Sequence, residues 1–243
     1  MTRFFVDAAQ MQGKFITLDG ENAAHARVLR LKNGEQVLVC DGQGNECVCT
    51  VSDLDAGQVS LVVSQMRRSQ SEAAVAVSVY MAFPKGDKLE HVIQKATELG
   101  ASEIVAFPAA RSVSRPDAKS LHKKAERWQK IAASAAEQSG RGIVPQVVVL
   151  DGYKQALERA VKADLALLFY ENEQATTLHM ALTETPFSTI VLITGPEGGL
   201  EEAEVQLARE KGARICTLGK RILRCETAPL CALSAVMYHA GEF

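Results

Sequence analysis

A glycine-rich segment from Thr194 to Leu200 contains the residues best suited to hold a ligand. The apolar run before it, residues 189–194, predicts a buried strand, and the residues after it predict a helix. Gly195, Gly198 and Gly199 have no side chains to shield the main-chain amides and carbonyls, so a ligand can approach the backbone closely. We therefore expect a backbone-lined binding site here; the alternative is a plain connection between a strand and a helix.

The ligand expected at this segment carries no phosphate. The segment matches neither the Gly-x-Gly-x-x-Gly pattern of dinucleotide-binding folds nor the Gly-Lys-Ser/Thr ending of a phosphate-binding loop. Three glutamates open the following helix, where they complement the helix dipole and would repel a phosphate: Glu201, Glu202 and Glu204. This argues against an α/β enzyme that binds a dinucleotide or ATP.

A second segment, residues 218–228, combines charged and apolar side chains between a predicted strand and a predicted helix. It holds three basic residues, a carboxylate and the Ile222-Leu223 pair, a mixture typical of a pocket more than of a solvated turn. We expect Thr227 to be the N-cap of the helix. Arg224 can either stabilise negative charge on a substrate or fix the loop through an ion pair with Glu226.

The composition is that of an ordinary globular protein. The chain has 243 residues, of which 47% are hydrophobic and 23% charged, and its formal net charge is -2. Without an overall basic excess, any RNA contact must use local patches. The six cysteines show no metal-ligand spacing, so we expect free thiols, no metal and no disulfide framework. The lack of an export signal and of a membrane-spanning run predicts a cytoplasmic protein without membrane contacts.

The first part of the chain has the pattern of a small β-barrel. Short strands are expected over residues 14–18, 36–40, 46–51 and 59–63. Residues 21–31 predict a short helical segment with two arginines, which either cap the barrel in solvent or contact RNA. The polar residues 66–72 are the best candidate for an interdomain linker.

After this linker, buried strands alternate with amphipathic helices, which predicts a parallel sheet covered on both faces. The strands are expected over residues 75–83, 104–107, 147–150, 165–170, 189–194 and 215–218. One helix, with an apolar stripe from Leu89 to Leu99, ends at Gly100. Another, over residues 118–139, is basic at its start, and this face is either solvated or contacts nucleic acid.

Several of these motifs together resemble the RsmE family of SPOUT methyltransferases. The paired signature is formed by Gly195-Pro196-Glu197-Gly198-Gly199 and, downstream, by Leu218-Gly219, Ile222-Leu223-Arg224 and Glu226-Thr227-Ala228. The likeness extends to residues 83–90, 97–100, 126–128, 137–141 and 27–30, and so covers nearly the whole chain. One position departs from the pattern: Ala24 stands where the family leads us to expect a histidine, and His25 follows it.

The resemblance implies a fold and an activity. The fold is a PUA-like RNA-binding β-barrel over residues 1–70, followed over residues 71–243 by an α/β SPOUT domain with a parallel sheet and a trefoil knot. The activity is the methylation of N3 of a uridine in 16S (small-subunit) ribosomal RNA by a homodimer that uses S-adenosyl-L-methionine. The implied cofactor-binding residues are Thr194, Gly195, Gly198, Gly199, Leu218, Gly219, Ile222 and Leu223.

The resemblance and the residue chemistry together suggest catalytic and RNA-binding roles. Arg224 is expected to stabilise negative charge on the uracil oxygens, and Glu197 or Glu226 to accept the N3 proton. Contacts to RNA phosphates are expected from Arg3, Arg27, Arg30, Lys85, Lys88, Arg111, Arg115 and Arg141. The alternative function is a non-catalytic RNA-binding factor for ribosome assembly on the same fold.

Overall fold

The computed structural model describes residues 1–55, 57–113 and 118–243, and its contacts divide the chain into two compact units. The first unit comprises Met1–Glu72 and Ala136–Val144. The second comprises Ala73–Ala135 and Pro145–Phe243. A short segment from the middle of the sequence therefore packs with the N-terminal residues.

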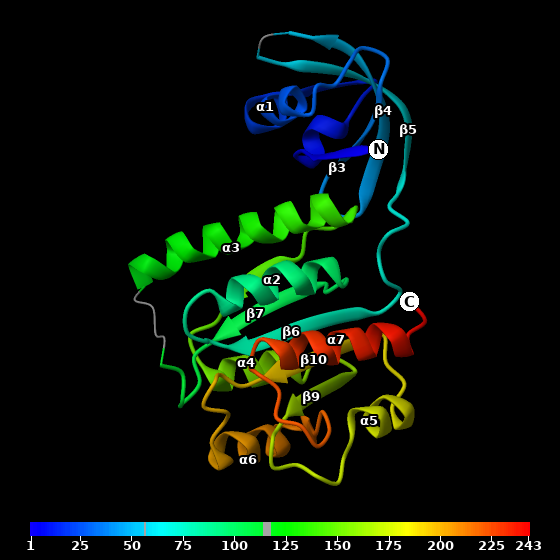
Figure 1. Ribbon diagram of the computed structural model, residues 1–243. Helices are drawn as coiled ribbons and strands as arrows, with labels where there is room; N and C mark the ends of the chain where they lie inside the picture. Colours follow the sequence, from blue (N-terminus) through cyan, green and yellow to red (C-terminus); the bar gives the residue numbers. More distant parts are fainter. Residues whose placement is uncertain (56, 114–117) are drawn as a thin grey trace. The chain divides into compact units, whose positions relative to one another are not determined.

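The first unit is built on a five-stranded sheet in the order β1 (Thr2–Phe5), β3 (Gln36–Cys40), β4 (Asn45–Leu54), β5 (Val59–Arg68) and β2 (Phe15–Leu18). β1 pairs with β3 in parallel, and the other neighbours are antiparallel. A 3-10 turn, η1 (Ala8–Met11), and α1 (Gly20–Val28) accompany the sheet (Figure 1). Its core includes the fully buried side chains of Phe4, Ile16, Leu18 and Leu61.

Two details of this unit differ from the sequence prediction. β1 was not expected, because four residues at the chain start are too short a pattern to distinguish from a turn. The expected linker 66–72 begins inside β5, whose last residues, Met66 to Arg68, pair with β4. The polar side chains there misled the prediction, because Arg67 serves as an ion-pair partner of the buried Glu46 (2.8 Å) and does not lie in a loop.

The second unit contains the predicted parallel sheet, with six strands in the order β11 (Arg214–Cys216), β9 (Leu165–Phe169), β10 (Thr189–Thr194), β6 (Ala76–Ala82), β7 (Glu103–Phe107) and β8 (Gln146–Val149). Every neighbouring pair is parallel. The expected strands are present within one or two residues of their predicted bounds, and β10 matches them. Because β9, β10 and β11 are neighbours, their carboxyl ends meet at one edge of the sheet.

Helices cover both faces of this sheet (Figure 1). α2 (Lys88–Glu98) and α7 (Thr227–His239) contact each other on one face, where α7 packs on β6 and β10. α4 (Tyr153–Ala160) and α6 (Glu202–Lys211) pack on the other, around a core that includes Phe107 and Leu168. α5 (Leu178–Glu184) lies against β11 and α7, and α3 (Ala118–Ser139) has the predicted bounds.

A buried ion pair holds residues 136–144 within the first unit. The Glu72 carboxylate accepts hydrogen bonds from Arg141 Nε (3.2 Å) and Nη2 (2.7 Å) and from the amides of Gly142 (2.8 Å) and Ile143 (3.0 Å). Arg141 is only 4% exposed. A phosphate has almost no access to this guanidinium, so we no longer retain Arg141 among the RNA contacts.

Replacing Arg141 therefore tests stability and not RNA affinity. Arg141→Met leaves the Glu72 carboxylate partly buried without its cation, which costs about 3 kcal/mol. Chemical denaturation should show this loss of unfolding free energy, while the folded variant binds RNA as the wild type does. Weaker RNA binding at unchanged stability would return Arg141 to the set of phosphate contacts.

Candidate active site

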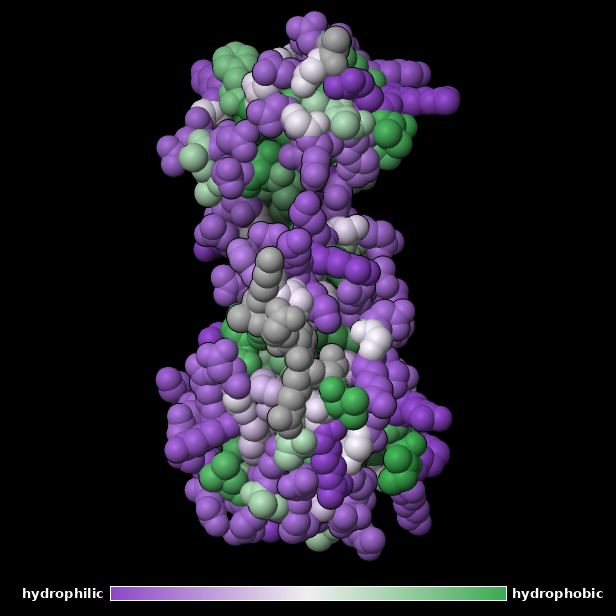
Figure 2. Space-filling view, turned by 90° about the vertical axis from the view of Figure 1, so that its left-hand side faces the viewer, coloured by the Kyte–Doolittle hydropathy of each residue, from purple (hydrophilic) through white to green (hydrophobic). Residues whose placement is uncertain are grey.

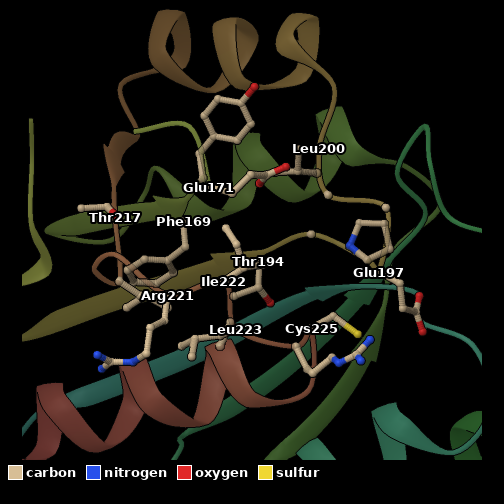
Figure 3. Close-up of a pocket in the computed structure, with 18 of the residues that line it drawn as sticks. Phe169, Glu171, Thr194, Glu197, Leu200, Thr217, Arg221, Ile222, Leu223 and Cys225 are labelled. Atoms are coloured by element: carbon tan, nitrogen blue, oxygen red, sulfur yellow. The ribbon is translucent and has the colours of Figure 1, made fainter. Parts of the chain in front are cut away.

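A cavity of about 510 Å³ opens at the carboxyl ends of β9, β10 and β11 (Figure 3). Its walls are the residues that directly follow these three strands. All eight predicted cofactor-binding residues line it: Thr194, Gly195, Gly198, Gly199, Leu218, Gly219, Ile222 and Leu223. Two of the three predicted catalytic residues, Glu197 and Arg224, line it as well. The two segments selected from the sequence are thus brought together.

The β10–α6 loop is a tight turn that only glycine can complete. The Gly199 amide donates to the Pro196 carbonyl (2.9 Å), and Gly199 has a φ of +68°, which side chains disfavour. A Cβ on Gly199 would lie 2.5 Å from Glu171 Oε1, and one on Gly195 would lie 3.1 Å from the Gly199 carbonyl carbon. The glycines therefore give the loop its close approach to the end of β9.

The acidic residues after this loop serve the helix and not the cavity. Glu201 is the N-cap of α6 and forms a capping box with Glu204, whose carboxylate accepts from the Glu201 amide (2.9 Å). The other Glu204 oxygen accepts from the Ala110 amide (2.8 Å). These contacts fix where α6 begins and so fix the end of the glycine loop.

Lys88 connects two of the predicted catalytic carboxylates. Its Nζ lies 3.0 Å from Glu197 Oε1 and 3.4 Å from Glu226 Oε2. Glu226, and not Thr227, is the N-cap of α7. Glu197 also accepts a hydrogen bond from the Lys85 amide (2.9 Å). This commitment of Lys88 to two carboxylates argues against its predicted role as an RNA phosphate contact.

Both glutamates are held as carboxylates. Partial burial alone would raise the pKa of Glu197, but the Lys85 amide and Lys88 outweigh it and hold the pKa below its usual value. The pKa of Glu226 is lowered by its own backbone amide, against some desolvation, and further by the Cys225 thiol and Lys88. The thiol donates to Glu226 Oε2 (3.2 Å), and burial raises the pKa of Cys225 to about 12.

Arg224 is exposed at the cavity wall and is not used to fix its loop. Among the described residues, the cation within 4 Å of Glu226 is Lys88, and no ion pair joins Glu226 to Arg224. The backbone of Arg224 instead starts α7, since its carbonyl accepts from the amides of Thr227 (2.9 Å) and Ala228 (3.0 Å). The guanidinium therefore remains available to a ligand.

Sequence analysis missed the wall contributed by β9. Phe169 is the last residue of that strand, Tyr170 and Glu171 follow it, and all three line the cavity. Figure 3 shows Phe169 and Glu171 there. No motif marks them, and only the strand order, which places β9 between β10 and β11, brings them to the site. Glu171 adds an exposed carboxylate beside the glycine loop.

The remaining predicted RNA contacts differ in their surroundings. Arg3 is excluded by its ion pair with the buried Glu46 (3.1 Å), because its side chain is only 10% exposed. Arg27 and Arg30 are exposed near the end of α1, and Lys85 is exposed before α2. Arg111 donates to the Gly198 carbonyl (3.0 Å) and so supports the glycine loop. Arg115 lies outside the described residues.

Other candidate sites are few. His25, displaced by one position from the family pattern, pairs with Glu137 (3.0 Å) inside the first unit. In the described part of the chain, no cluster of three or more His, Cys, Asp or Glu side chains suits a metal, and no helix is long and apolar enough to cross a membrane. The face in Figure 2 is largely hydrophilic, with hydrophobic side chains in small groups.

Comparison with known families covers both parts of the chain. Residues 71–237 match the model of the RNA methyltransferase domain, and residues 18–64 match that of the RNA methyltransferase PUA domain. The α/β domain, with its glycine-lined cavity at the strand ends, and the PUA domain before it define an RNA methyltransferase.

Individual relatives narrow this class. The chain is similar to the ribosomal RNA small subunit methyltransferase E of Bacillus subtilis, with 39% identity over 98% of this chain and 96% of the relative. It is similar to the crystal structure of that enzyme from Neisseria gonorrhoeae bound to S-adenosyl methionine, with a TM-score of 0.87, 31% identity, and 98% and 97% of the two chains covered. A Legionella pneumophila methyltransferase in complex with this cofactor has a TM-score of 0.85, 28% identity and 98% coverage of both chains.

The chain therefore belongs to the ribosomal RNA small subunit methyltransferase E family. The family predicted from the sequence is confirmed, and so is the fold class, an α/β SPOUT methyltransferase domain preceded by a PUA-like β-domain.

The glycine loop can be tested at Gly199. Gly199→Ala adds a methyl group that meets Glu171. It also places a side chain on a residue with positive φ, which costs about 1–2 kcal/mol. Calorimetry should show affinity for S-adenosyl methionine, the molecule bound in the Neisseria relative, reduced at least about tenfold. Gly212→Ala is the control, since Gly212 also has a positive φ of +98° but its Cβ would meet nothing within 4 Å. Equal affinities for both variants would contradict the assignment of the loop.

Proposed function

We propose that this protein transfers a methyl group from S-adenosyl-L-methionine to N3 of a uridine in the 16S RNA of the small ribosomal subunit. The family supports the enzyme class, and two similar structures hold this cofactor. The observation that carries the proposal is the single cavity that gathers both predicted loops, Arg224 and Glu197.

The cavity fits this cofactor in size and in chemistry. A volume of about 510 Å³ lies in the range of small-molecule sites. Backbone groups at Gly195, Gly198 and Gly219 suit the polar edge of an adenine, and Leu200 and Leu223 supply apolar wall. The exposed Glu171 carboxylate suits a cationic ligand. Bound there, S-adenosyl-L-methionine supplies a methyl group on a positively charged sulfur, which an aligned nitrogen can displace.

The protein's own residues then activate the uracil. The N3–H bond must break before the nitrogen can attack, and a carboxylate of Glu197 or Glu226 accepts the proton. The electron pair left on N3 delocalises onto the neighbouring carbonyl oxygens. Arg224, which lines the cavity, stabilises this negative charge as a preorganised cation.

Substrate RNA is held by exposed cations in this proposal. Arg27 and Arg30 of the first unit, and Lys85 and Arg111 of the second, remain candidates for phosphate contacts. RNA binding should weaken as salt rises, because each contact releases counterions. We further propose that the enzyme acts as a homodimer in the cytoplasm, which the family resemblance supports; sedimentation tests the dimer.

The direct test is methyl transfer from labelled S-adenosyl-L-methionine to small ribosomal subunits that lack the modification. Nucleoside mass spectrometry should detect N3-methyluridine. Naked 16S RNA, tested in parallel, shows whether the enzyme prefers the assembled subunit as its substrate. A protein whose melting temperature does not rise with the cofactor, and which methylates neither substrate, would be the non-catalytic assembly factor.

Arg224→Ala should abolish transfer while leaving the cofactor bound. Loss of one preorganised charge at a reacting oxygen lowers kcat by about 10²–10³-fold. Lys220→Ala is the matched control, because Lys220 is exposed on the same loop but does not line the cavity. Single-turnover methylation and calorimetry with the cofactor measure both effects. Retention of kcat in the Arg224 variant would remove this residue from the mechanism.

A further inference from the structure

Three segments of the second unit converge on one ammonium group. Lys88 lies in the first turn of α2, Glu197 in the β10–α6 loop, and Cys225 and Glu226 immediately before α7. Lys88 Nζ lies 3.0 Å and 3.4 Å from the two carboxylates and donates to Cys225 Sγ at 3.8 Å. Figure 3 shows Glu197 and Cys225 on the same side of the cavity.

We propose that Lys88 is a positioning residue for methyl transfer: it holds the carboxylates of Glu197 and Glu226 together as an ionised pair with one cation, ready to take a single proton from the target base. This rests on the proposed function, since it concerns the same reaction. It replaces the role of Lys88 as a phosphate contact that the sequence suggested.

The physical reason is the charge of the cluster. Two carboxylates held close together repel each other, which raises the pKa of one partner, and a cation between them offsets this repulsion. With Lys88 the cluster Lys88, Glu197 and Glu226 has a formal charge of -1, and accepting one proton makes it neutral. Without Lys88 the charge is -2, and the repulsion raises the pKa of one carboxylate.

The neighbouring groups do not replace this cation. The Lys85 amide donates to Glu197 and the Cys225 thiol to Glu226, but both donors are neutral. Arg224 lines the cavity and makes no ion pair with Glu226 among the described residues. On α2 itself, His91 is exposed, and Glu90 is occupied by Arg127 of α3 (2.6 Å).

The lowered pKa values of Glu197 and Glu226 and the raised pKa of Lys88, whose main cause is its hydrogen bond to Glu197, agree with this arrangement. Removing Lys88 raises the pKa of the carboxylate pair, so the fully ionised pair exists only at higher pH. Activity is then lost on the acidic side of the pH profile and recovers as the pH increases.

The experiment compares the pH dependence of kcat, at saturating RNA and cofactor, for the wild type, Lys88→Met and Lys88→Arg. In Lys88→Met, we expect the acidic limb of the kcat profile to move to higher pH by about one unit or more, because a charge within 4–6 Å shifts the pKa of a carboxyl by that much. Lys88→Arg should return the acidic limb to its wild-type position, because arginine keeps the positive charge. Lys95→Met is the control, since Lys95 lies on the same helix and pairs only with Glu98 among the described residues. Its limb should match the wild type.

Two outcomes would overturn the proposal. A higher KM for RNA and a shallower salt dependence, with the limb unmoved, would make Lys88 a phosphate contact. A uniform fall of kcat at every pH would make its role merely structural.

A second measurement needs neither cofactor nor RNA. Carbon-13 NMR of labelled glutamate carboxyls, assigned with Glu197→Gln and Glu226→Gln, should show one of the two titrating at higher pH in Lys88→Met. Unchanged titration would refute the proposal even where kcat falls. If the wild type forms no N3-methyluridine while this NMR shift is present, it is the proposed reaction that fails and not the ion cluster.

Discussion

The parallel pairing of β9, β10 and β11 is the constraint on which the site depends. β10 pairs with β9 through Ile190–Ile193, and β11 pairs with β9 through Arg214–Cys216, so three carboxyl ends meet within one edge of the sheet. A loop follows each strand end, and these loops form the walls of one cavity. Ligands bind outside the carboxyl ends of such sheets because the connecting loops there are free of strand pairing.

The loops that follow β10 and β11 are held by polar contacts with other elements of the second unit. Lys88 joins the first turn of α2 to Glu197 and Glu226 in the two loops of the candidate site, and Arg111 supports the glycine turn through the Gly198 carbonyl. Glu204 caps α6 and accepts from the Ala110 amide. The chemistry therefore depends on residues far apart in sequence. This explains why single motifs indicate a site here without revealing how its charges are arranged.

The repeating patterns of the chain were sufficient to predict most elements. The continuous apolar run of residues 189–194 and the helically spaced apolar stripe of α2 were both found as the expected elements. Strand order has no such local pattern, so the wall at Phe169 to Glu171 was missed. The positions of basic residues were also a poor guide to phosphate contacts, because the sequence does not show whether a basic side chain is exposed or paired. Arg3 and Arg141 were taken for phosphate contacts, but their side chains are only 10% and 5% exposed and are bound to carboxylates. Lys88 was taken for one as well; it is partly exposed and pairs with Glu197.

Hydrogen exchange read by mass spectrometry, with and without S-adenosyl-L-methionine, tests most directly the claim that these strand ends form the cofactor site. We predict that the cofactor slows exchange of amides in residues 194–200 and 217–225, which contain most of the cavity lining, and of those that follow β9. Protection confined to the first unit, or spread evenly over the chain without these segments, would contradict it.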